Sequence, residues 1–265
     1  MEKVRAIVLR AAGINCDVET EFALRLAGAE AQRVHINRII ESPDTLERYQ
    51  ILVVPGGFSY GDDVAAGKIL ANQIVHHLAD AMRKFIADGK LVLGICNGFQ
   101  VLVKAQILPG FADAAAREPT QQQVSITYND SGKYEDRWVY LEPVSQRCVF
   151  VEPGRRIYLP VAHGEGKVVT RDKNILDRLE AEGHVAFRYV DRDGQVGAFP
   201  INPNGSVNAI AGLTDSTGRV LGLMPHPERF VHRTQHPHWT RLAETNGAYG
   251  MTLFNNAVQF VKQNL

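Results

Sequence analysis

The sequence predicts an α/β protein with an open, mostly parallel sheet that is covered by helices on both faces and extended by antiparallel strands. In the first half of the chain, apolar runs typical of buried strands alternate with segments of helical spacing. In the second half, short strand-like segments follow one another, separated by Gly, Asn, Asp and Pro turns. A length of 265 residues is enough for one large core. We therefore expect a single domain over residues 1–265.

The first half contains four expected strands and three expected helices. Strands are expected at residues 4–9 (VRAIVL), 31–36 (AQRVHI), 51–54 (ILVV) and 90–95 (KLVLGI), and helices at residues 18–28, about 64–87 and 98–106. The strands are apolar almost throughout, as they are where helices bury both faces of a parallel sheet. Pro55, Gly56 and Gly57 end the third strand, and Gly89 closes the long helix.

The second half supplies the antiparallel additions. Strands are expected at residues 124–128 (VSITY), 137–144 (RWVYLEPV), 155–164 (RRIYLPVAHG), 167–170 (KVVT), 184–190 (HVAFRYV) and 220–227 (VLGLMPHP), and an amphipathic helix at residues 250–263. Residues of about 112–123 are polar and rich in Ala and Gln, which indicates an exposed insertion. The tail over about 230–265 begins with a segment rich in His, Arg, Trp and Tyr, which fits either a surface loop or a protein interface.

Composition excludes several classes of protein. Lys and Arg balance Asp and Glu at 29 each, and no basic stretch is interleaved with aromatic residues, so we expect no nucleic-acid site. No apolar run approaches the roughly 20 residues of a membrane span, and the apolar stretch near the start is too short for a signal peptide. Three distant cysteines make no disulfide framework. These features predict a reduced, cytoplasmic protein without a membrane partner.

Cys96 lies between an expected strand and an expected helix, in the pattern Gly94-Ile95-Cys96-Asn97-Gly98. Ligands of α/β proteins gather at the carboxyl ends of parallel strands. The pattern has the form of a nucleophile elbow, with Cys where hydrolases carry Ser. Glycines leave room around a strained central residue, and the helix N-terminus favours a thiolate. A packed structural cysteine beside a glycine-rich turn fits the same pattern. The choice between a nucleophile and a packed cysteine therefore depends on residues elsewhere in the chain.

The candidate base for such a nucleophile is His226, in the segment LGLMPHPER. Residues two apart in an extended chain point the same way, so Glu228 is placed to orient the His226 ring and stabilise its imidazolium. The alternative is a solvated histidine and glutamate in a proline-rich turn. Oxyanion donors are expected from the backbone N–H of Asn97 and from the loop that contains Gly56, Gly57 and Phe58. A plain glycine-rich turn is the alternative for that loop.

Together these residues resemble a known family. The stretches GICNGFQ, GGFSYGDD, NDSGKYEDRWVYL, HGEG and GLMPHPER are similar to those of class I (triad-type) glutamine amidotransferases, and most closely to their branch in purine biosynthesis, the glutaminase subunits of phosphoribosylformylglycinamidine synthase. The matching stretches run from the N-terminus to about Arg229. The resemblance implies a flavodoxin-like core and glutamine as the substrate.

The resemblance also implies a role for each site residue. Cys96 would attack the carboxamide of glutamine, His226 would move the protons, and Glu228 would orient His226. The N–H groups of Gly57 and Asn97 would hold the oxyanion. The residues implied to contact the substrate are Gly56, Phe58, Gln100, His163 and Gly164.

The chain contains no phosphate-binding loop, no dinucleotide fingerprint and no acidic Mg²⁺ cluster. We therefore expect no cofactor in this chain, with ATP and Mg²⁺ on a synthase partner. The resemblance implies that synthase subunit and a small accessory subunit as partners, and ammonia as the product delivered. An amidotransferase subunit of another synthase, a cysteine hydrolase or peptidase of similar fold, and an inactive binding subunit are the alternatives.

Two further groups of residues invite functional readings. Cys16 starts an expected helix, but it has no elbow glycine and no neighbouring base in the sequence, so we interpret it as a packed residue. His232, His236 and His238 match no metal-ligand signature, so we expect no metal site.

Overall fold

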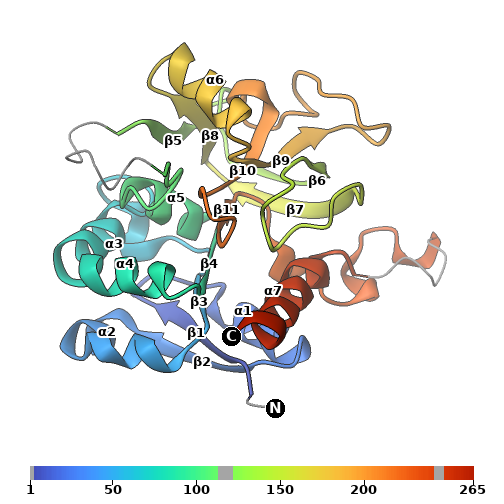
Figure 1. The fold of residues 1–265 in the computed structure, drawn as a ribbon. Coiled ribbons are helices and arrows are strands. Elements are labelled where there is room, and N and C mark those ends of the chain that lie inside the picture. The colour runs from blue at the N-terminus through green and yellow to red at the C-terminus, as the bar shows by residue number, and fades with distance from the viewer. Residues whose placement is uncertain (1–2, 113–121, 242–247) are drawn as a thin grey trace.

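The structure, a computed structural model, describes residues 3–112, 122–241 and 248–265. Its centre is a nine-stranded sheet (Figure 1). In spatial order the strands are β2 (Glu30–His35), β1 (Arg5–Arg10), β3 (Ile51–Val54), β4 (Leu91–Ile95), β11 (Val220–Leu223), β10 (Ile210–Thr214), β9 (Val185–Val190), β6 (Glu135–Pro143) and β7 (Ile157–His163). The first five are parallel, and the remaining four join them as antiparallel additions. The expected fold class is confirmed.

Helices cover both faces of the parallel half of the sheet. They are α1 (Asp17–Leu26), α2 (Ile36–Glu41), α3 (Lys68–Gln73), α4 (Ala79–Ala87), α5 (Asn97–Lys104) and α7 (Gly250–Asn264), whereas α6 (Lys173–Ala181) packs against strand β8 (Glu165–Thr170). Helices α1 and α7 lie on one face of the parallel strands, and α3, α4 and α5 lie on the other (Figure 1). A separate two-stranded sheet pairs β5 (Val124–Tyr128) with β8 (Glu165–Thr170).

The order of the central strands explains the position of the loops discussed below. Strands β3, β4 and β11 are buried at every residue, because helices cover both of their faces. Their registers are parallel, so Val54 pairs with Gly94 and Leu223 pairs with Ile95. The three strands therefore end side by side, and the loops that follow them meet at one edge of the sheet.

The structure differs from the expectation at several elements. The helix expected over about 64–87 begins at Lys68 and is interrupted by a π-helical turn over Ile74–Leu78. Strand β10 and helices α2 and α6 were not expected. The single-domain organisation stays a prediction, and most of the proposed insertion at 112–123 lies outside the described residues. Within the described ranges, no helix is both long and apolar enough to cross a membrane.

The first part of the tail packs against the antiparallel half of the sheet. Phe230 is 1% exposed, and its ring lies 5.2 Å from that of Trp138 in β6. The ring of His236 packs against those of Trp138 and Tyr158, at 5.3 and 5.4 Å, and His236 is 8% exposed. Gly250, the first residue of α7, donates its N–H to the carbonyl oxygen of Phe230 at 3.0 Å. This part of the tail is consequently a packed element of the fold.

Candidate active site

Cys96 occupies a strained turn between β4 and α5. Its φ is 50° and its ψ is −106°, a conformation that L residues adopt only where the surroundings impose it. A Cβ on Gly98 would lie 1.8 Å from the carbonyl oxygen of Val54, and a Cβ on Gly94 would lie 2.6 Å from a methyl group of Leu102. Glycine is thus required on both sides of Cys96, because the start of the helix and the ends of the strands lie too close together to leave room for a side chain at either position.

The Cys96 thiol lies at the edge where the central strands end. The residue is 5% exposed, and its Sγ is 3.7 Å from the carbonyl oxygen of Ala162 in β7. The N–H of Cys96 donates to the carbonyl oxygen of Leu223, the last residue of β11, at 2.8 Å. Cys96 also precedes the first turn of α5, where unpaired N–H groups and the helix dipole favour negative charge.

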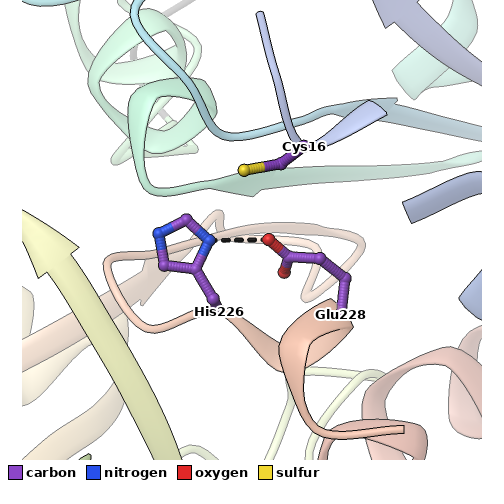
Figure 2. A group of neighbouring side chains, drawn as sticks. All are labelled: Cys16, His226 and Glu228. Carbon is purple, nitrogen blue, oxygen red and sulfur yellow. Dashed lines mark hydrogen bonds and ion pairs between the residues drawn. The ribbon is translucent and has the colours of Figure 1, made fainter. Parts of the chain in front are cut away.

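His226 and Glu228 follow β11, the strand beside β4. Nδ1 of His226 lies 2.6 Å from Oε1 of Glu228, and the residues are 1% and 0% exposed (Figure 2). The N–H of His226 donates to the carbonyl oxygen of Pro160 at 2.8 Å, which fixes the turn against β7. Nε2 is buried and has no nitrogen or oxygen partner in the described part of the chain.

The charges around His226 favour its protonated form. Burial by itself lowers the pKa of this imidazole, but the charges of Glu228 and Cys96, with hydrogen bonds from Cys16 and Cys96, outweigh burial and raise the pKa well above its usual value. A histidine with one nitrogen bound to a carboxylate and the other free of oxygen and nitrogen partners can accept and return a proton at that second nitrogen.

The glycine loop after β3 lies against the segment that precedes α1. Gly57 has a φ of 141°, and a Cβ there would lie 2.7 Å from the N of Asn15. Neighbouring backbone groups hold the loop in place: Phe58 donates to the carbonyl oxygen of Gly13 at 2.9 Å. The N–H groups of Gly57 and Asn97 take no part in the hydrogen bonds between loops of the described residues. The oxyanion role expected of these two N–H groups stays a prediction.

The side chain of Asn97 links the elbow to the glycine loop. Its Oδ1 accepts the N–H of Ser59 at 3.2 Å, and its Nδ2 donates to Asp62 at 3.1 Å and to Gln100 at 2.9 Å. Gln100 in turn donates to the carbonyl oxygen of Glu165. Gln100 is 3% exposed, and both of its amide atoms are engaged with the protein. In this structure its visible role is to hold the Glu165 loop beside the elbow.

His163 lies at the end of β7, one residue after the carbonyl that contacts Cys96. It is 3% exposed, and its Nδ1 is 3.1 Å from Oδ1 of Asn129. Burial, followed by the nearby charge of His226, lowers the pKa of His163 to about 3, so this imidazole is neutral at physiological pH. A Cβ on Gly166 would lie 2.3 Å from the His163 ring, which explains the second glycine of the HGEG stretch.

Two partly exposed aromatic rings, those of Phe58 and Tyr134, lie close to one another. Phe58 is 45% exposed, and its ring centroid lies 6.5 Å from that of Tyr134, which is 52% exposed. Burial and then the charge of Cys96 raise the pKa of Tyr134. Gly164 approaches the same ring, because a Cβ there would lie 3.9 Å from Tyr134. Sequence reasoning missed Tyr134 and Asn129, although both belong to the stretch NDSGKYEDRWVYL.

Cys16 is packed, as expected, at 0% exposure, but it lies beside the proposed triad, which the sequence did not indicate. Its sulfur, a nitrogen of His226 and an oxygen of Glu228 lie within 4.8 Å of one another (Figure 2). Three such donors could approach a metal ion, but two of the groups are engaged with neighbouring residues. Arg229 donates to the sulfur at 3.2 Å, and the His226 nitrogen is bonded to the carboxylate. The expectation of no metal stays a prediction.

Comparison with known proteins identifies the class. The profile of the CobB/CobQ-like glutamine amidotransferase domain matches residues 3–261. A glutamine amidotransferase of Thermotoga maritima (tm1158) has the same fold, with a TM-score of 0.56 at 15% identity over 100% of both chains. The fold and the family match together define a glutamine amidotransferase.

Closer relatives identify the branch. Phosphoribosylformylglycinamidine synthase subunit PurQ of Dehalococcoides mccartyi is 43% identical over 99% of this chain and 100% of its own length. PurQ of Archaeoglobus fulgidus is 42% identical over 86% of this chain and 88% of its own length. A chain in the structure of PurLQS from Thermotoga maritima has a TM-score of 0.73 at 31% identity, over 98% of this chain and 100% of that chain. The protein belongs to the PurQ family, the glutamine amidotransferase component of phosphoribosylformylglycinamidine synthase.

Proposed function

We propose that this chain hydrolyses glutamine to glutamate and ammonia with Cys96 as nucleophile, His226 as acid and base, and Glu228 as the residue that orients His226. The observation that carries the proposal is the buried 2.6 Å contact between His226 and Glu228 at the end of β11, beside the strand whose end presents Cys96. A nucleophile, a base and an orienting carboxylate from adjacent strand ends are what acyl transfer requires.

In the first half-reaction, Cys96 Sγ forms a bond to the carboxamide carbon of glutamine. The proton of the thiol passes to Nε2 of His226, and the carboxamide oxygen becomes an oxyanion. His226 then protonates the amide nitrogen as the C–N bond breaks. Ammonia leaves, and a γ-glutamyl thioester remains on Cys96.

In the second half-reaction, His226 takes a proton from a water molecule that attacks the thioester carbon. The C–S bond breaks, glutamate leaves, and the proton returns to the sulfur. Glu228 stabilises the imidazolium in both halves. The N–H groups of Gly57 and Asn97 stabilise each oxyanion, and losing such a donor typically costs about 3 kcal/mol of transition-state stabilisation.

The amino-acid end of glutamine is assigned to the wall formed by Gly56, Phe58, His163 and Gly164. Phe58 and Tyr134 border this wall on the solvent side. Gln100 contributes through the Glu165 carbonyl that it holds.

The released ammonia is passed to a synthase subunit, which uses it with ATP and Mg²⁺ to convert formylglycinamide ribonucleotide to formylglycinamidine ribonucleotide. The structure named PurLQS, which contains the 31% identical chain, supports a complex with a synthase subunit and a small accessory subunit. Balanced charge and the lack of a spanning helix in the described ranges are in keeping with a cytoplasmic site of action.

The test is glutaminase activity of the Cys96→Ala variant, assayed with and without the synthase subunit. Cys148→Ala is the matched control, because Cys148 is equally buried at 4% exposure but lies outside the site. We expect Cys96→Ala to lose glutamine-dependent synthesis while the complex still uses added ammonia. Full glutamine-dependent activity in Cys96→Ala would overturn the mechanism.

A further inference from the structure

Cys16 is fixed rigidly at the back of the proposed triad. It is 0% exposed, and its N–H donates to the carbonyl oxygen of Gly56 at 3.2 Å. Thr20 donates to the Cys16 carbonyl oxygen from both its N–H and its hydroxyl, at 3.2 and 2.6 Å. The residue is thereby bound to the glycine loop on one side and to the first turn of α1 on the other.

The Cys16 sulfur has two hydrogen-bond partners besides the triad. Arg229 donates from Nη2 to the sulfur at 3.2 Å, and the thiol donates to Oδ1 of Asn15 at 3.3 Å. Burial raises the pKa of the Cys16 thiol, so it remains protonated and can serve both partners. A neutral thiol without an elbow is a poor nucleophile. Its contacts therefore indicate a role in holding other groups.

The same sulfur closes one side of the His226 ring. A Cβ on Gly56 would lie 2.8 Å from Cε1 and 3.3 Å from Nδ1 of His226, and 3.2 Å from the Cys16 sulfur. Gly56, the thiol and this edge of the imidazole consequently pack against one another. Figure 2 shows the sulfur directed toward the ring on the side of Glu228. Both residues of the His226–Glu228 bond are buried, at 1% and 0% exposure.

The carboxylate of Glu228 has one oxygen that the structure leaves unsatisfied. Oε1 is bonded to His226, whereas Oε2 is buried without a partner among the residues described. Arg229 is the next residue, and a guanidinium binds a carboxylate more strongly than it binds a thiol. In the structure Arg229 nonetheless donates to Cys16. The thiol thus holds a cation that would compete with His226 for Glu228.

We propose that Cys16 is a positioning residue of the glutaminase site: its thiol keeps the Arg229 guanidinium away from Glu228 and closes the Nδ1 side of His226 to water. This inference rests on the proposed roles of Cys96, His226 and Glu228. Loss of the thiol frees the Arg229 guanidinium to pair with Glu228. The Glu228 carboxylate still bonds to His226, but its negative charge is then balanced by Arg229 and supports the imidazolium less.

Loss of Cys16 has a predicted effect on the pH profile. The groups whose charge or hydrogen bonding acts on or near His226 are Glu228, Cys96, Cys16, His163, Tyr134 and Arg229. Pairing of Glu228 with Arg229 removes the main influence that raises the pKa of His226. A lower pKa means that the imidazolium, which protonates the departing ammonia, is lost at lower pH. The alkaline limb of the activity profile therefore moves toward acid.

The experiment compares Cys16→Ala, Cys16→Ser and the control Cys148→Ala in the full chain with its synthase subunit. For Cys16→Ala we expect kcat for glutamine to fall by about tenfold to a hundredfold, the size of effect that slight misplacement of a reacting group produces. We expect KM to change little and the alkaline limb to shift to lower pH. Cys16→Ser should restore much of both, because a hydroxyl accepts the Arg229 hydrogen bond. Cys148→Ala should alter neither.

A second substitution tests the competition directly. Arg229→Met placed in the Cys16→Ala chain removes the cation, and we expect it to return the alkaline limb toward its wild-type position. Cys16→Val fills the space of the thiol without accepting a hydrogen bond. It replaces Cys16→Ala if Cys16→Ala does not fold, and we expect the same fall in kcat and the same shift of the alkaline limb.

Wild-type kcat and pH profile in Cys16→Ala would overturn the inference, as would a loss of kcat with an unshifted alkaline limb. Cys96→Ala, measured in parallel, distinguishes a failure of the proposed function from a failure of the role proposed for Cys16. Glutamine-dependent activity in Cys96→Ala contradicts the proposed function itself, whereas unaffected Cys16 variants beside an inactive Cys96→Ala contradict only the role of Cys16.

Discussion

The side-chain oxygen of Asn129 lies 3.1 Å from Nδ1 of His163 and accepts the N–H of Gly166 at the same distance. The amide nitrogen of Asn129 donates to the carbonyl oxygens of Lys133 and His163, at 2.9 and 2.8 Å, which determines how the amide is oriented. Because that oxygen can only accept, the His163 ring must donate from Nδ1. Its Nε2 is then a buried acceptor without a partner among the described residues.

Asn129→Ala tests the substrate role assigned to His163. Without the amide, the ring loses its fixed tautomer and the loop over His163–Gly166 loses three hydrogen bonds. We expect KM for glutamine to rise by about tenfold, the equivalent of roughly one hydrogen bond, with a smaller change in kcat. Steady-state kinetics measure both constants. Ser131→Ala, in the same turn but exposed, is the control, and an unchanged KM in Asn129→Ala would contradict the assignment.

His163 makes the stability of the protein depend on pH. Its pKa is about 3 in the folded chain against an ordinary value of 6.5, so below pH 6.5 the unfolded chain binds a proton that the folded chain does not. The free energy of unfolding therefore falls as pH falls, by about 2 to 3 kcal/mol from this residue between pH 7.5 and 4.5. Urea denaturation of wild type and His163→Gln at both values measures it, and His77→Gln is an exposed control. Equal pH dependence in wild type and His163→Gln would refute the prediction.

Gly98→Ala tests the steric basis of the elbow. The added methyl group would lie 1.8 Å from the Val54 carbonyl oxygen, so either the helix or the strand must move. We expect a loss of about 3 kcal/mol or more in the free energy of unfolding, together with loss of glutaminase activity. Gly132→Ala is the matched control, because nothing lies within 4 Å of a Cβ there and only its φ of 62° is strained. Comparable melting temperatures for the two variants would argue against this account.

Glu228→Gln tests the charge of the orienting residue while preserving its shape. The amide oxygen can still accept from Nδ1 of His226, but the negative charge that supports the imidazolium is lost. We expect kcat to fall by about a hundredfold or more, with the alkaline limb of the pH profile shifted to lower pH because the pKa of His226 falls. Activity with added ammonia reports whether the complex is intact. A Glu228→Gln variant with wild-type kcat would remove Glu228 from the mechanism.

Predictions from the sequence succeeded where the residues that determine a local structure lie close together in the chain. The glycines around Cys96 indicated a tight strand-to-helix turn, and the structure shows the contacts that exclude any other residue at Gly94 and Gly98. The spacing of His226 and Glu228 anticipated their contact, because the two residues are close in the chain and lie in one stiff turn.

Sequence reasoning failed where the cause lies far along the chain. The packing of Cys16 was predicted correctly, but its position beside His226 and Glu228 was not, because its partners Gly56 and Arg229 are brought to it only by the parallel pairing of the strands. Strand β10 was missed because IAGLT is short and contains a glycine that packs against β11. The interruption of the long helix at Ile74–Leu78 has no glycine or proline to mark it.

Strand β11 enters the sheet between β4 and β10, although it is the last strand of the chain to be made. During synthesis on the ribosome, the elbow that bears Cys96 can therefore form long before β11 arrives with His226 and Glu228. Until that strand inserts, Cys96 lacks the base that we propose for it, and the sheet has a gap at its centre. In the proposed mechanism, insertion of β11 and activation of the thiol are one event, so a nascent or truncated chain that lacks β11 would have no base for Cys96.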